Sequence, residues 1–199
     1  KSPDGLTWTF TLRGDAKWSD GKPVTTKDFL ASWKRALLPA TACQYAYMLY
    51  PIAGAEAFNR GKGEWEQVGV TAKDDRTLVV KLGAPCAYFL DLCAFETLMP
   101  VRVDVIEQHG DRWSRAENMV SNGPFKLKEW LPSQRITMVK NEHYWDRDFV
   151  KLEQVIALPY EDLETAYKLF KQGEVDWNTA VPAAKIDELK RMPEYYATP

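Results

Sequence analysis

The chain has 199 residues, which is enough for one large domain or two small ones with a hydrophobic core. Apolar residues make up 45% and charged residues 27%, as in ordinary globular proteins, and a net charge of −2 favours neither a nucleic acid nor an anionic membrane as partner. No apolar run approaches the roughly 20 residues that span a bilayer, and the opening KSPDG lacks the basic patch and apolar run of a signal peptide.

The first predicted elements are a strand and a capped helix joined by a turn. Residues 8–12 alternate bulky and polar side chains, which indicates a half-buried strand. Residues 19–23 read SDGKP, a dense cluster of turn formers. Thr25 then begins a capping-box pattern that Asp28 completes, and Pro39 ends the helix that follows.

The next part of the chain predicts short helices around one β-hairpin. Residues 68–72 and 77–82 have the strand pattern on either side of a turn at residues 73–76. Residues 40–50, by contrast, are irregular and rich in tyrosine. Short helices are predicted at residues 53–59, 87–94 and 103–109, the last of them closed by Gly110.

The remainder predicts a second group of strands followed by two helices. Strands are expected at residues 125–130, 135–139 and 152–158, and helices at residues 162–172 and 182–191. The side chains that the first of these helices turns inward are Leu163, Ala166, Tyr167 and Phe170. Because strands and helices are interspersed without a regular βαβ rhythm, the pattern favours a mixed α/β architecture over a TIM barrel or a doubly wound sheet.

The residue types that metal and catalytic sites need are missing or scattered. His109 and His143 lie too far apart in sequence to indicate a metal site. The Gly-Lys pairs at residues 21–22 and 61–62 are followed by Pro23 and Gly63, so neither can be a P-loop. We therefore predict a binding protein and not an enzyme, with no catalytic residue, no metal and no cofactor.

Two carboxylate pairs are the only support for an enzyme. Asp74 and Asp75, and likewise Asp146 and Asp148, stand in turn-like sequence. Solvation explains such pairs more simply than acid–base catalysis, which needs one buried carboxyl group. Basic residues are not interleaved with aromatic ones on a single face, so this segment is not expected to bind nucleic acid.

The three cysteines are Cys43, Cys86 and Cys93. If Cys86 and Cys93 shared one helix, their Cα atoms would be about 10 Å apart, too far for a disulfide. A helix that begins after Cys86 relaxes this limit, and a bridge from Cys43 to either of the others stays open. We favour free, buried and inert thiols.

Three motifs carry a resemblance to a known family. They are WTFTLRGDAKWSDGKPVTTKDFLASWKR at residues 8–35, SNGPFKLKEW followed by KNEHYW within residues 121–145, and FKQGEVDW at residues 170–177. In order and spacing they resemble the signature of family 5 extracytoplasmic solute-binding proteins. Residues 39–58 and 70–82 are similar to the oligopeptide-binding branch of that family.

The resemblance implies a fold and a function. The fold would be a partial type II periplasmic-binding-protein fold, with a small α+β domain at residues 1–102 and part of the main lobe at residues 103–199. The function would be that of the substrate-binding component of an ABC importer, which captures oligopeptides outside the cytoplasm and delivers them to permease subunits. The protein would be a monomer, periplasmic or a cell-surface lipoprotein. Family members are much longer, so we expect this chain to be a fragment that lacks the second lobe.

The resemblance also implies where a ligand binds. In the oligopeptide-binding branch, a tyrosine a few residues after the proline that ends the capped helix lies in the peptide cleft. Tyr45 matches it, six residues after Pro39, and Tyr47 is the second candidate. Either could instead be packed between lobes.

The motif residues themselves are expected to be scaffold. Trp18, Asp20 and Gly21 would form a turn, and Pro124 with the pair Tyr144-Trp145 would set backbone direction and pack the core.

Other functions remain open at this point. The same module could sense a solute in a transcription regulator that carries a separate DNA-binding domain. The ligand could be a dipeptide, nickel or a sugar, all of which the wider family binds. An enzyme that uses the Asp-rich loops is a third possibility.

Overall fold

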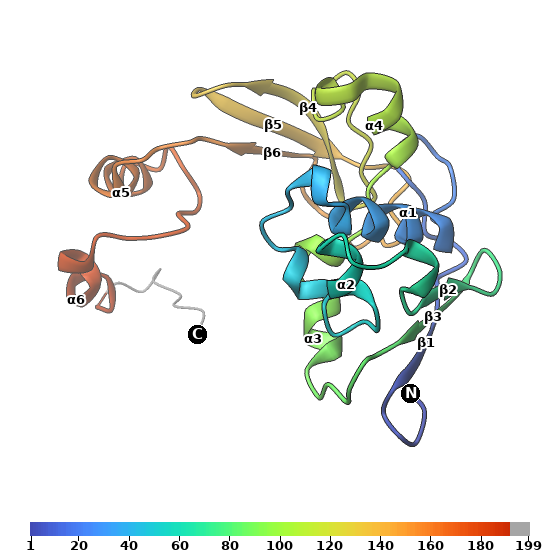
Figure 1. Ribbon diagram of the computed structural model, residues 1–199. Coiled ribbons are helices and arrows are strands. Elements are labelled where there is room, and N and C mark those ends of the chain that lie inside the picture. The colour runs from blue at the N-terminus through green and yellow to red at the C-terminus, as the bar shows by residue number, and fades with distance from the viewer. Residues whose placement is uncertain (192–199) are drawn as a thin grey trace. The chain divides into compact units, whose positions relative to one another are not determined.

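The computed structural model describes residues 1–191, which fall into two units (Figure 1). The larger unit comprises Lys1–Trp130 and Ile136–Ile156, and the smaller one Leu131–Arg135 with the residues from Ala157 onward. Within the described residues, no helix combines the length and the apolar character that a membrane crossing requires. The domain boundary expected at residue 102 stays a prediction.

A three-stranded antiparallel sheet lies in the larger unit. Its order is β1 (Thr7–Thr11), β3 (Thr77–Lys81) and β2 (Val70–Ala72). Trp8 and Val70 both pair with Val80, and all three side chains are buried on the same face. The alternation that the sequence shows at residues 8–12 and in the hairpin is therefore confirmed, since successive strand residues face opposite sides of a sheet.

Helix α1 (Thr26–Leu37) follows the first strand and begins where the capping pattern predicts. The Asp28 carboxylate accepts hydrogen bonds from the backbone N–H of Thr25 at 2.7 Å and from its hydroxyl at 3.0 Å. Trp33 and Leu37 are buried on one side of the helix. The helix ends before Pro39, which opens the short 3-10 helix η1 (Pro39–Thr41), because proline cannot continue the hydrogen-bond ladder.

The core of the larger unit forms between α1, the sheet and three short helices. These helices are η2 (Ala46–Leu49), α3 (Phe89–Cys93) and η4 (Glu96–Leu98). The buried members of the core are Trp8, Trp33, Leu37, Leu49, Ile52, Ala55, Val68, Val70, Leu78, Val80, Leu82, Cys86, Phe89 and Leu98. The Trp33 indole N–H donates to the carbonyl of Leu98 at 2.9 Å within this core, which ties η4 to α1.

Four further helices complete this unit. They are α2 (Ala55–Asn59), η3 (Trp65–Gln67), α4 (Val103–His109) and η5 (Gly110–Arg112). Helix α4 has the bounds that the sequence predicts. Gly54 precedes α2 with φ +75°, and a Cβ atom there would lie 2.5 Å from the carbonyl oxygen of Gln67. Only glycine fits such a close backbone approach in the left-handed region.

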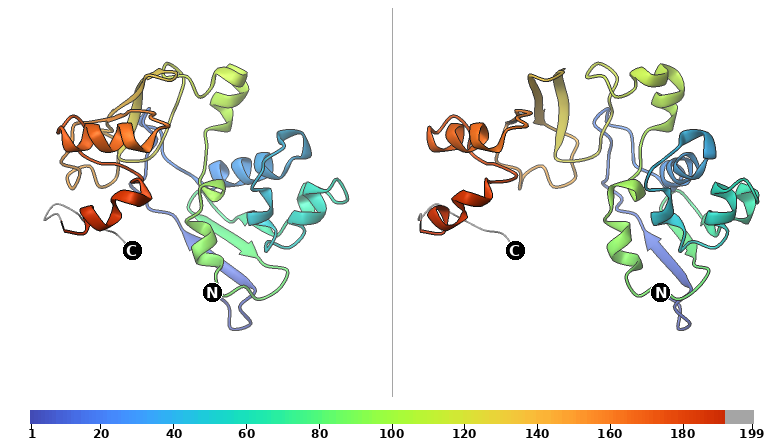
Figure 2. Two further views of the ribbon diagram at one scale, coloured as in Figure 1. Left: turned by 90° about the vertical axis from the view of Figure 1, so that its left-hand side faces the viewer. Right: turned by 60° about the vertical axis from the view of Figure 1, so that its left-hand side comes forward.

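A second three-stranded sheet has the order β4 (Phe125–Leu131), β5 (Arg135–Lys140) and β6 (Gln154–Ala157). Strands β4 and β5 run side by side as the predicted pair (Figure 2). Asn141 follows β5 and is fully buried. Its side-chain amide donates to the carbonyl of Gly123 at 2.9 Å, and its side-chain oxygen accepts from the N–H of His143 at 3.0 Å. This residue joins the segment before β4 to the segment after β5.

The smaller unit contains α5 (Leu163–Lys171), η6 (Ala183–Lys185) and α6 (Ile186–Leu189). Tyr167 is buried, and its hydroxyl hydrogen-bonds the Glu188 carboxylate at 3.1 Å. Two expectations fail here. Leu163, predicted to face inward, is 40% exposed because it stands in the first turn of α5. The single helix predicted for residues 182–191 is instead a 3-10 turn followed by one short α-helix.

All three cysteines are free thiols, as predicted, and no pairing forms. Cys86 is buried, whereas Cys43 and Cys93 are only partly buried, so the expectation of full burial is wrong for two of them. Burial raises the pKa of the Cys93 thiol to about 11. Because the thiolate is the reactive form, this thiol is poorly reactive at neutral pH.

Asn141→Ala is expected to lower the free energy of unfolding by about 2–4 kcal/mol, because it leaves two partly buried backbone groups, the Gly123 carbonyl and the His143 N–H, without their partners. Urea denaturation of the chain measures the change. Asn118→Ala is the matched control, since its side chain donates one hydrogen bond, to Arg112, from a half-buried position, and we expect a loss of about 1 kcal/mol. Equal losses in the two variants would contradict the role given to Asn141.

Candidate functional site

The first family motif forms a tight turn at residues 18–23. Its backbone closes through hydrogen bonds from Gly21 N–H to the Trp18 carbonyl and from Trp18 N–H to the Lys22 carbonyl, both at 2.8 Å. Gly21 has φ +85°, a conformation that L side chains rarely adopt. The Trp18 ring is 1% exposed. The expectation that these residues form a turn is confirmed.

This turn is held by a buried arginine from a distant part of the chain. Arg102 is 5% exposed, and its guanidinium contacts Asp20 at 2.7 Å and Asp104 at 2.6 Å. Arg102 lies 82 residues from Asp20. Two carboxylates therefore compensate one buried cation, which satisfies the requirement that a buried charge be paired.

The pairing changes the titration of both carboxyl groups. Burial of Asp20 works against its ionised form, but hydrogen bonds from Arg102 and from the Lys22 N–H outweigh it, so the pKa of Asp20 is lowered. The hydrogen bond from Arg102 lowers the pKa of Asp104. In return, the hydrogen bonds that Arg102 donates to Asp104 and Asp20 raise the pKa of Arg102 despite its burial. All three groups are charged at neutral pH.

The second family motif meets the same turn. The Ser19 N–H donates to the Ser121 carbonyl at 2.7 Å, and the Ser121 N–H donates to the Ser19 hydroxyl at 3.2 Å. Trp145, expected in the core, is 42% exposed. Its ring lies 3.5 Å beneath the Arg13 guanidinium, so a cation–π contact at the surface takes the place of core packing.

A pocket of about 400 Å³ lies beside this turn and the start of α1. Its lining includes Trp18, Lys22, Thr25, Asp28, Arg102 and Asp104. Most of its polar groups are already engaged, because Asp28 caps α1 and Arg102 binds two carboxylates. A ligand would have to displace these partners, so the pocket is a poor candidate for the binding site.

The two tyrosines predicted to contact ligand stand together on the surface of the larger unit. Tyr45 is 43% and Tyr47 50% exposed, and their ring centroids lie 6.0 Å apart. The Phe95 ring meets Tyr45 edge to face at 5.3 Å. We call these three residues the aromatic face.

Burial within two short helices explains why the rings point outward. Ala46 and Leu49 of η2 are buried, whereas Tyr45, which directly precedes η2, and Tyr47 within it are exposed. In η4, Leu98 is buried and is held to α1 by the Trp33 indole. The aromatic face therefore stands on elements that are anchored from beneath, as binding residues on a rigid scaffold commonly are.

The aromatic face has free hydrogen-bonding capacity. Among the residues that the structure describes, no hydrogen-bond partner is present for the hydroxyl of Tyr45 or Tyr47. A phenol can cover an apolar group with its ring and also donate or accept a hydrogen bond at its hydroxyl. Sequence reasoning did not include Phe95, because nothing local marks it and only the fold brings it to Tyr45.

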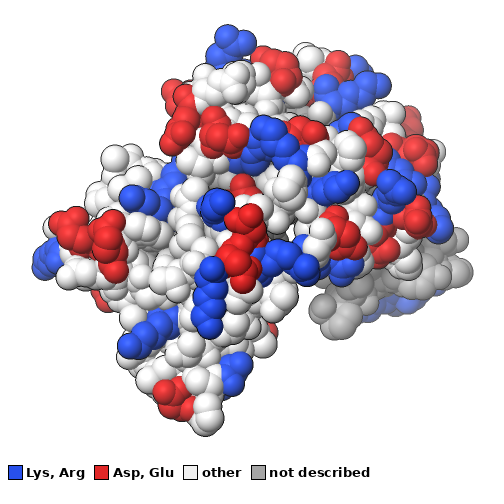
Figure 3. Space-filling view, turned by 90° about the vertical axis from the view of Figure 1, so that its right-hand side faces the viewer, with Lys and Arg blue, Asp and Glu red and all other residues white. Residues whose placement is uncertain are grey.

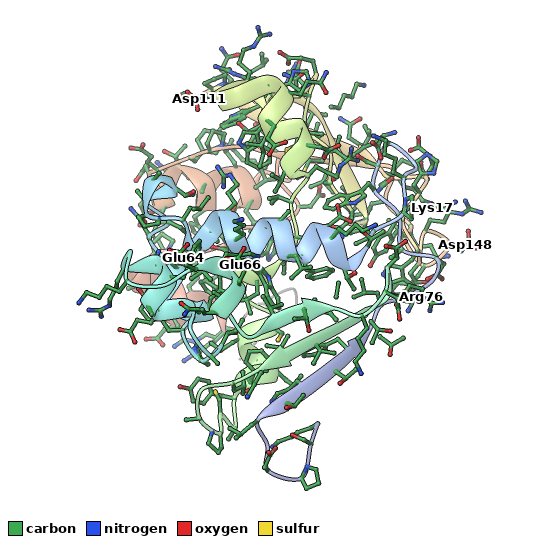
Figure 4. All side chains as sticks on the ribbon, turned by 45° about the vertical axis from the view of Figure 1, so that its right-hand side comes forward. Lys17, Glu64, Glu66, Arg76, Asp111 and Asp148 are labelled. Carbon is green, nitrogen blue, oxygen red and sulfur yellow. The ribbon has the colours of Figure 1, made fainter. Side chains whose placement is uncertain are left out.

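The carboxylate pairs have the features of surface turns. Asp74 accepts hydrogen bonds from the N–H groups of Arg76 and Thr77, each at 2.8 Å, and that from Arg76 contributes most to lowering its pKa. The Asp148 side chain is 98% exposed and points outward in Figure 4. Neither has the buried environment of a general acid.

The described residues do not indicate a metal site or a nucleic-acid site either. Across residues 1–191, no group of three or more His, Cys, Asp or Glu side chains is arranged to hold a metal ion. On the face drawn in Figure 3, acidic and basic side chains are intermixed. An electrostatic footprint for nucleic acid would instead be a stripe of basic residues.

Comparison with known proteins identifies the family. The model of the bacterial extracellular solute-binding proteins, family 5, matches residues 1–198. The chain belongs to this family of solute-binding proteins. The resemblance drawn from the three motifs is thereby confirmed.

Individual family 5 proteins show how much of the fold is present. The oligopeptide-binding protein OppA of Bacillus subtilis is 47% identical over 88% of this chain and 32% of its own length. The structure of Burkholderia pseudomallei OppA matches with a TM-score of 0.92 at 37% identity, over 96% of this chain and 38% of that one.

A further structure contains a bound peptide. Haemophilus influenzae OppA in complex with the peptide RPPGFSPFR matches with a TM-score of 0.90 at 36% identity, over 96% of this chain and 38% of that one. The chain thus spans about a third of the length of these proteins. The expected fold class, a partial α/β fold of the type II periplasmic binding proteins, is confirmed.

Asp20→Asn is expected to destabilise the chain at neutral pH by about 1.5–3 kcal/mol, the range for a hydrogen bond to a charged group. The pKa of Asp20 is lowered from its usual 3.8, so its stabilising effect is complete above pH 3.8 and is lost as the pH falls through the lowered value. Urea denaturation of both proteins from pH 7 downward should show the difference shrinking in acid.

The control for this experiment is Asp15→Asn. Asp15 pairs with Arg13 at 3.0 Å, but both side chains are at least half exposed, so a much smaller loss is expected. A difference between wild type and Asp20→Asn that is the same at every pH would contradict the assignment.

Proposed function

We propose that the complete protein containing this chain is the substrate-binding component of an ABC importer, and that it binds oligopeptides. The observation that carries the proposal is the aromatic face, whose two phenol hydroxyls have no partner within residues 1–191, on a chain of family 5. Members similar to this chain are named oligopeptide-binding proteins, and one was solved with a bound peptide. The protein acts by binding and catalyses no reaction.

Tyr45 and Tyr47 are the proposed ligand-contacting residues. A tyrosine immobilises only two side-chain torsions when it binds, so it offers a large contact area at a small entropic cost. Its hydroxyl can hydrogen-bond a peptide backbone, which is common to all sequences. A site of this kind binds many peptides, because backbone contacts supply affinity and water can fill the space around varied side chains.

The remaining features of the proposal follow from the family. The protein acts outside the cytoplasm, in the periplasm or as a cell-surface lipoprotein, as a monomer that delivers peptide to permease subunits. Residues 1–102 are the small domain and residues 103–199 belong to the main lobe. Closure of two lobes over the ligand about a hinge would trap the peptide.

A solute-sensing module of a transcription regulator and a receptor for a dipeptide, nickel or a sugar are the alternatives. The full reading frame separates the first of these from a transporter, because a secretory or lipoprotein signal supports transport and a helix-turn-helix domain supports regulation. Mass spectrometry of ligand that co-purifies with the complete protein identifies the solute.

In the complete natural gene product that contains these residues, Tyr45→Ala is expected to weaken peptide binding about tenfold or more, because tyrosines that become buried under a bound partner are frequent hot spots. Tyr45→Phe removes only the hydroxyl, and we expect a loss of about two- to tenfold. Isothermal titration calorimetry with mixed peptides measures both.

Tyr88→Ala is the matched control for the tyrosine variants. Tyr88 is 59% exposed and belongs to the start of α3, outside the aromatic face, so its removal should leave the affinity unchanged. Unaltered binding by Tyr45→Ala would exclude Tyr45 from the site.

The 199 residues by themselves are expected to bind peptide only weakly. The relatives that are named for peptide binding are about three times as long, and we expect much of their contact surface to lie in the parts that this chain does not match. Calorimetry with the isolated chain should give a Kd above about 1 μM, which corresponds to a binding free energy weaker than about −8.2 kcal/mol. Tighter binding would show that these residues hold the whole site.

A further inference from the structure

The aromatic face stands in an uncharged part of the chain. From residue 38 to residue 55 the sequence has no Asp, Glu, Lys, Arg or His. Both tyrosines of the face fall within this stretch. Within the aromatic face, a charge that acts on a ligand can therefore come only from the second segment, which carries Phe95.

Glu96 supplies such a charge. It directly follows Phe95, whose ring lies 5.3 Å from that of Tyr45, and consecutive Cα atoms are about 3.8 Å apart. Glu96 is exposed at the first position of η4. No ion pair or side-chain hydrogen bond engages its carboxylate within residues 1–191. An exposed carboxylate without a partner in the described residues thus directly follows a member of the aromatic face in the chain.

Two basic residues on the elements around η4 have other partners. Lys34, one of two basic residues in the last turn of α1, lies 5.8 Å over the Trp65 ring. Arg102, the first basic residue after η4, is held by Asp20 and Asp104. The negative charge of Glu96 is therefore available to a ligand.

We propose that Glu96 is a specificity-determining residue, whose carboxylate binds a cationic group of a peptide while a neighbouring apolar side chain of that peptide lies on the aromatic face. The proposal rests on peptide binding by the complete protein. It identifies the preferred substrates as peptides that combine basic and apolar residues. Acidic peptides are disfavoured at this edge by repulsion between like charges.

The size of the preference follows from the exposure of the carboxylate. Exposed ion pairs give about a twofold to fivefold change in an equilibrium constant. Salt weakens such pairs, because the Debye length falls from about 10 Å at 0.1 M to about 3 Å at 1 M. The preference for basic peptides should therefore be largest at low ionic strength.

The experiment compares two peptides on three forms of the complete natural gene product. The probes are RPPGFSPFR and the same peptide with both arginines replaced by citrulline, which keeps the shape and removes the charge. The proteins are the wild type, Glu96→Gln, and the control Glu66→Gln, which makes the same charge change on η3 (Figure 4). Calorimetry at low and high salt gives the ratio of the two affinities.

The wild type and Glu66→Gln should prefer the arginine peptide by about twofold to fivefold at low salt. Glu96→Gln should bind both peptides equally, with its affinity for the citrulline peptide unchanged. A ratio in Glu96→Gln that equals that of the wild type overturns the proposal for Glu96 and leaves peptide binding intact. If the wild type binds neither of these peptides, and no further peptide of any charge, the proposed function is overturned as well.

Discussion

The indole N–H of Trp33 donates to the carbonyl of Leu98 inside the core, and the position of the aromatic face depends on this bond. Leaving a buried donor or acceptor unpaired costs about 1–3 kcal/mol, so breaking the bond between the Trp33 indole and the Leu98 carbonyl would be unfavourable. Trp33 belongs to α1, which leads directly into the segment that carries Tyr45, and Leu98 closes the helix that follows Phe95. One buried hydrogen bond therefore links the two segments that meet at the surface.

The apolar side chains beneath the face complete this constraint. Leu49 and Leu98 are almost fully buried and belong to the same core. Burial of one leucine stabilises by about 1.5–3 kcal/mol, which anchors each 3-10 helix although neither is long enough to be stable alone. Because the leucines of these two 3-10 helices point into the core, the tyrosine and phenylalanine side chains beside them face outward. Exposed aromatic rings at the surface are thus a consequence of the packing below them.

Polar residues of the family motifs and the proposed ligand-contacting residues differ in one physical property. Asp20 of the first motif is paired with Arg102, and the Asn141 side chain of the second motif is bonded to backbone groups, so both stabilise the fold but have little capacity left for a ligand. The phenol hydroxyls of the aromatic face and the Glu96 carboxylate have no partner within the described residues. Exposed polar groups without a partner therefore distinguish the proposed site from Asp20 and Asn141, whereas the unpartnered groups of the first motif, the indole N–H groups of Trp8 and Trp18, are buried.

Local sequence was sufficient where neighbouring residues decide the structure. The alternation in β1, the cap of α1 and the bounds of α4 all follow from contacts within a few residues, and the motifs in order identified the family. The sequence also indicated Tyr45, through the family resemblance, as a candidate for ligand contact.

Only the tertiary structure decided the features that depend on residues far apart in the chain. It pairs Arg102 with a residue 82 positions away, brings Phe95 to Tyr45, and stacks Trp145 on Arg13 at the surface where core packing was expected. A periodic pattern reports which side of its own element a residue occupies. It carries no information on what lies opposite, because that contact is set by the packing of the whole core.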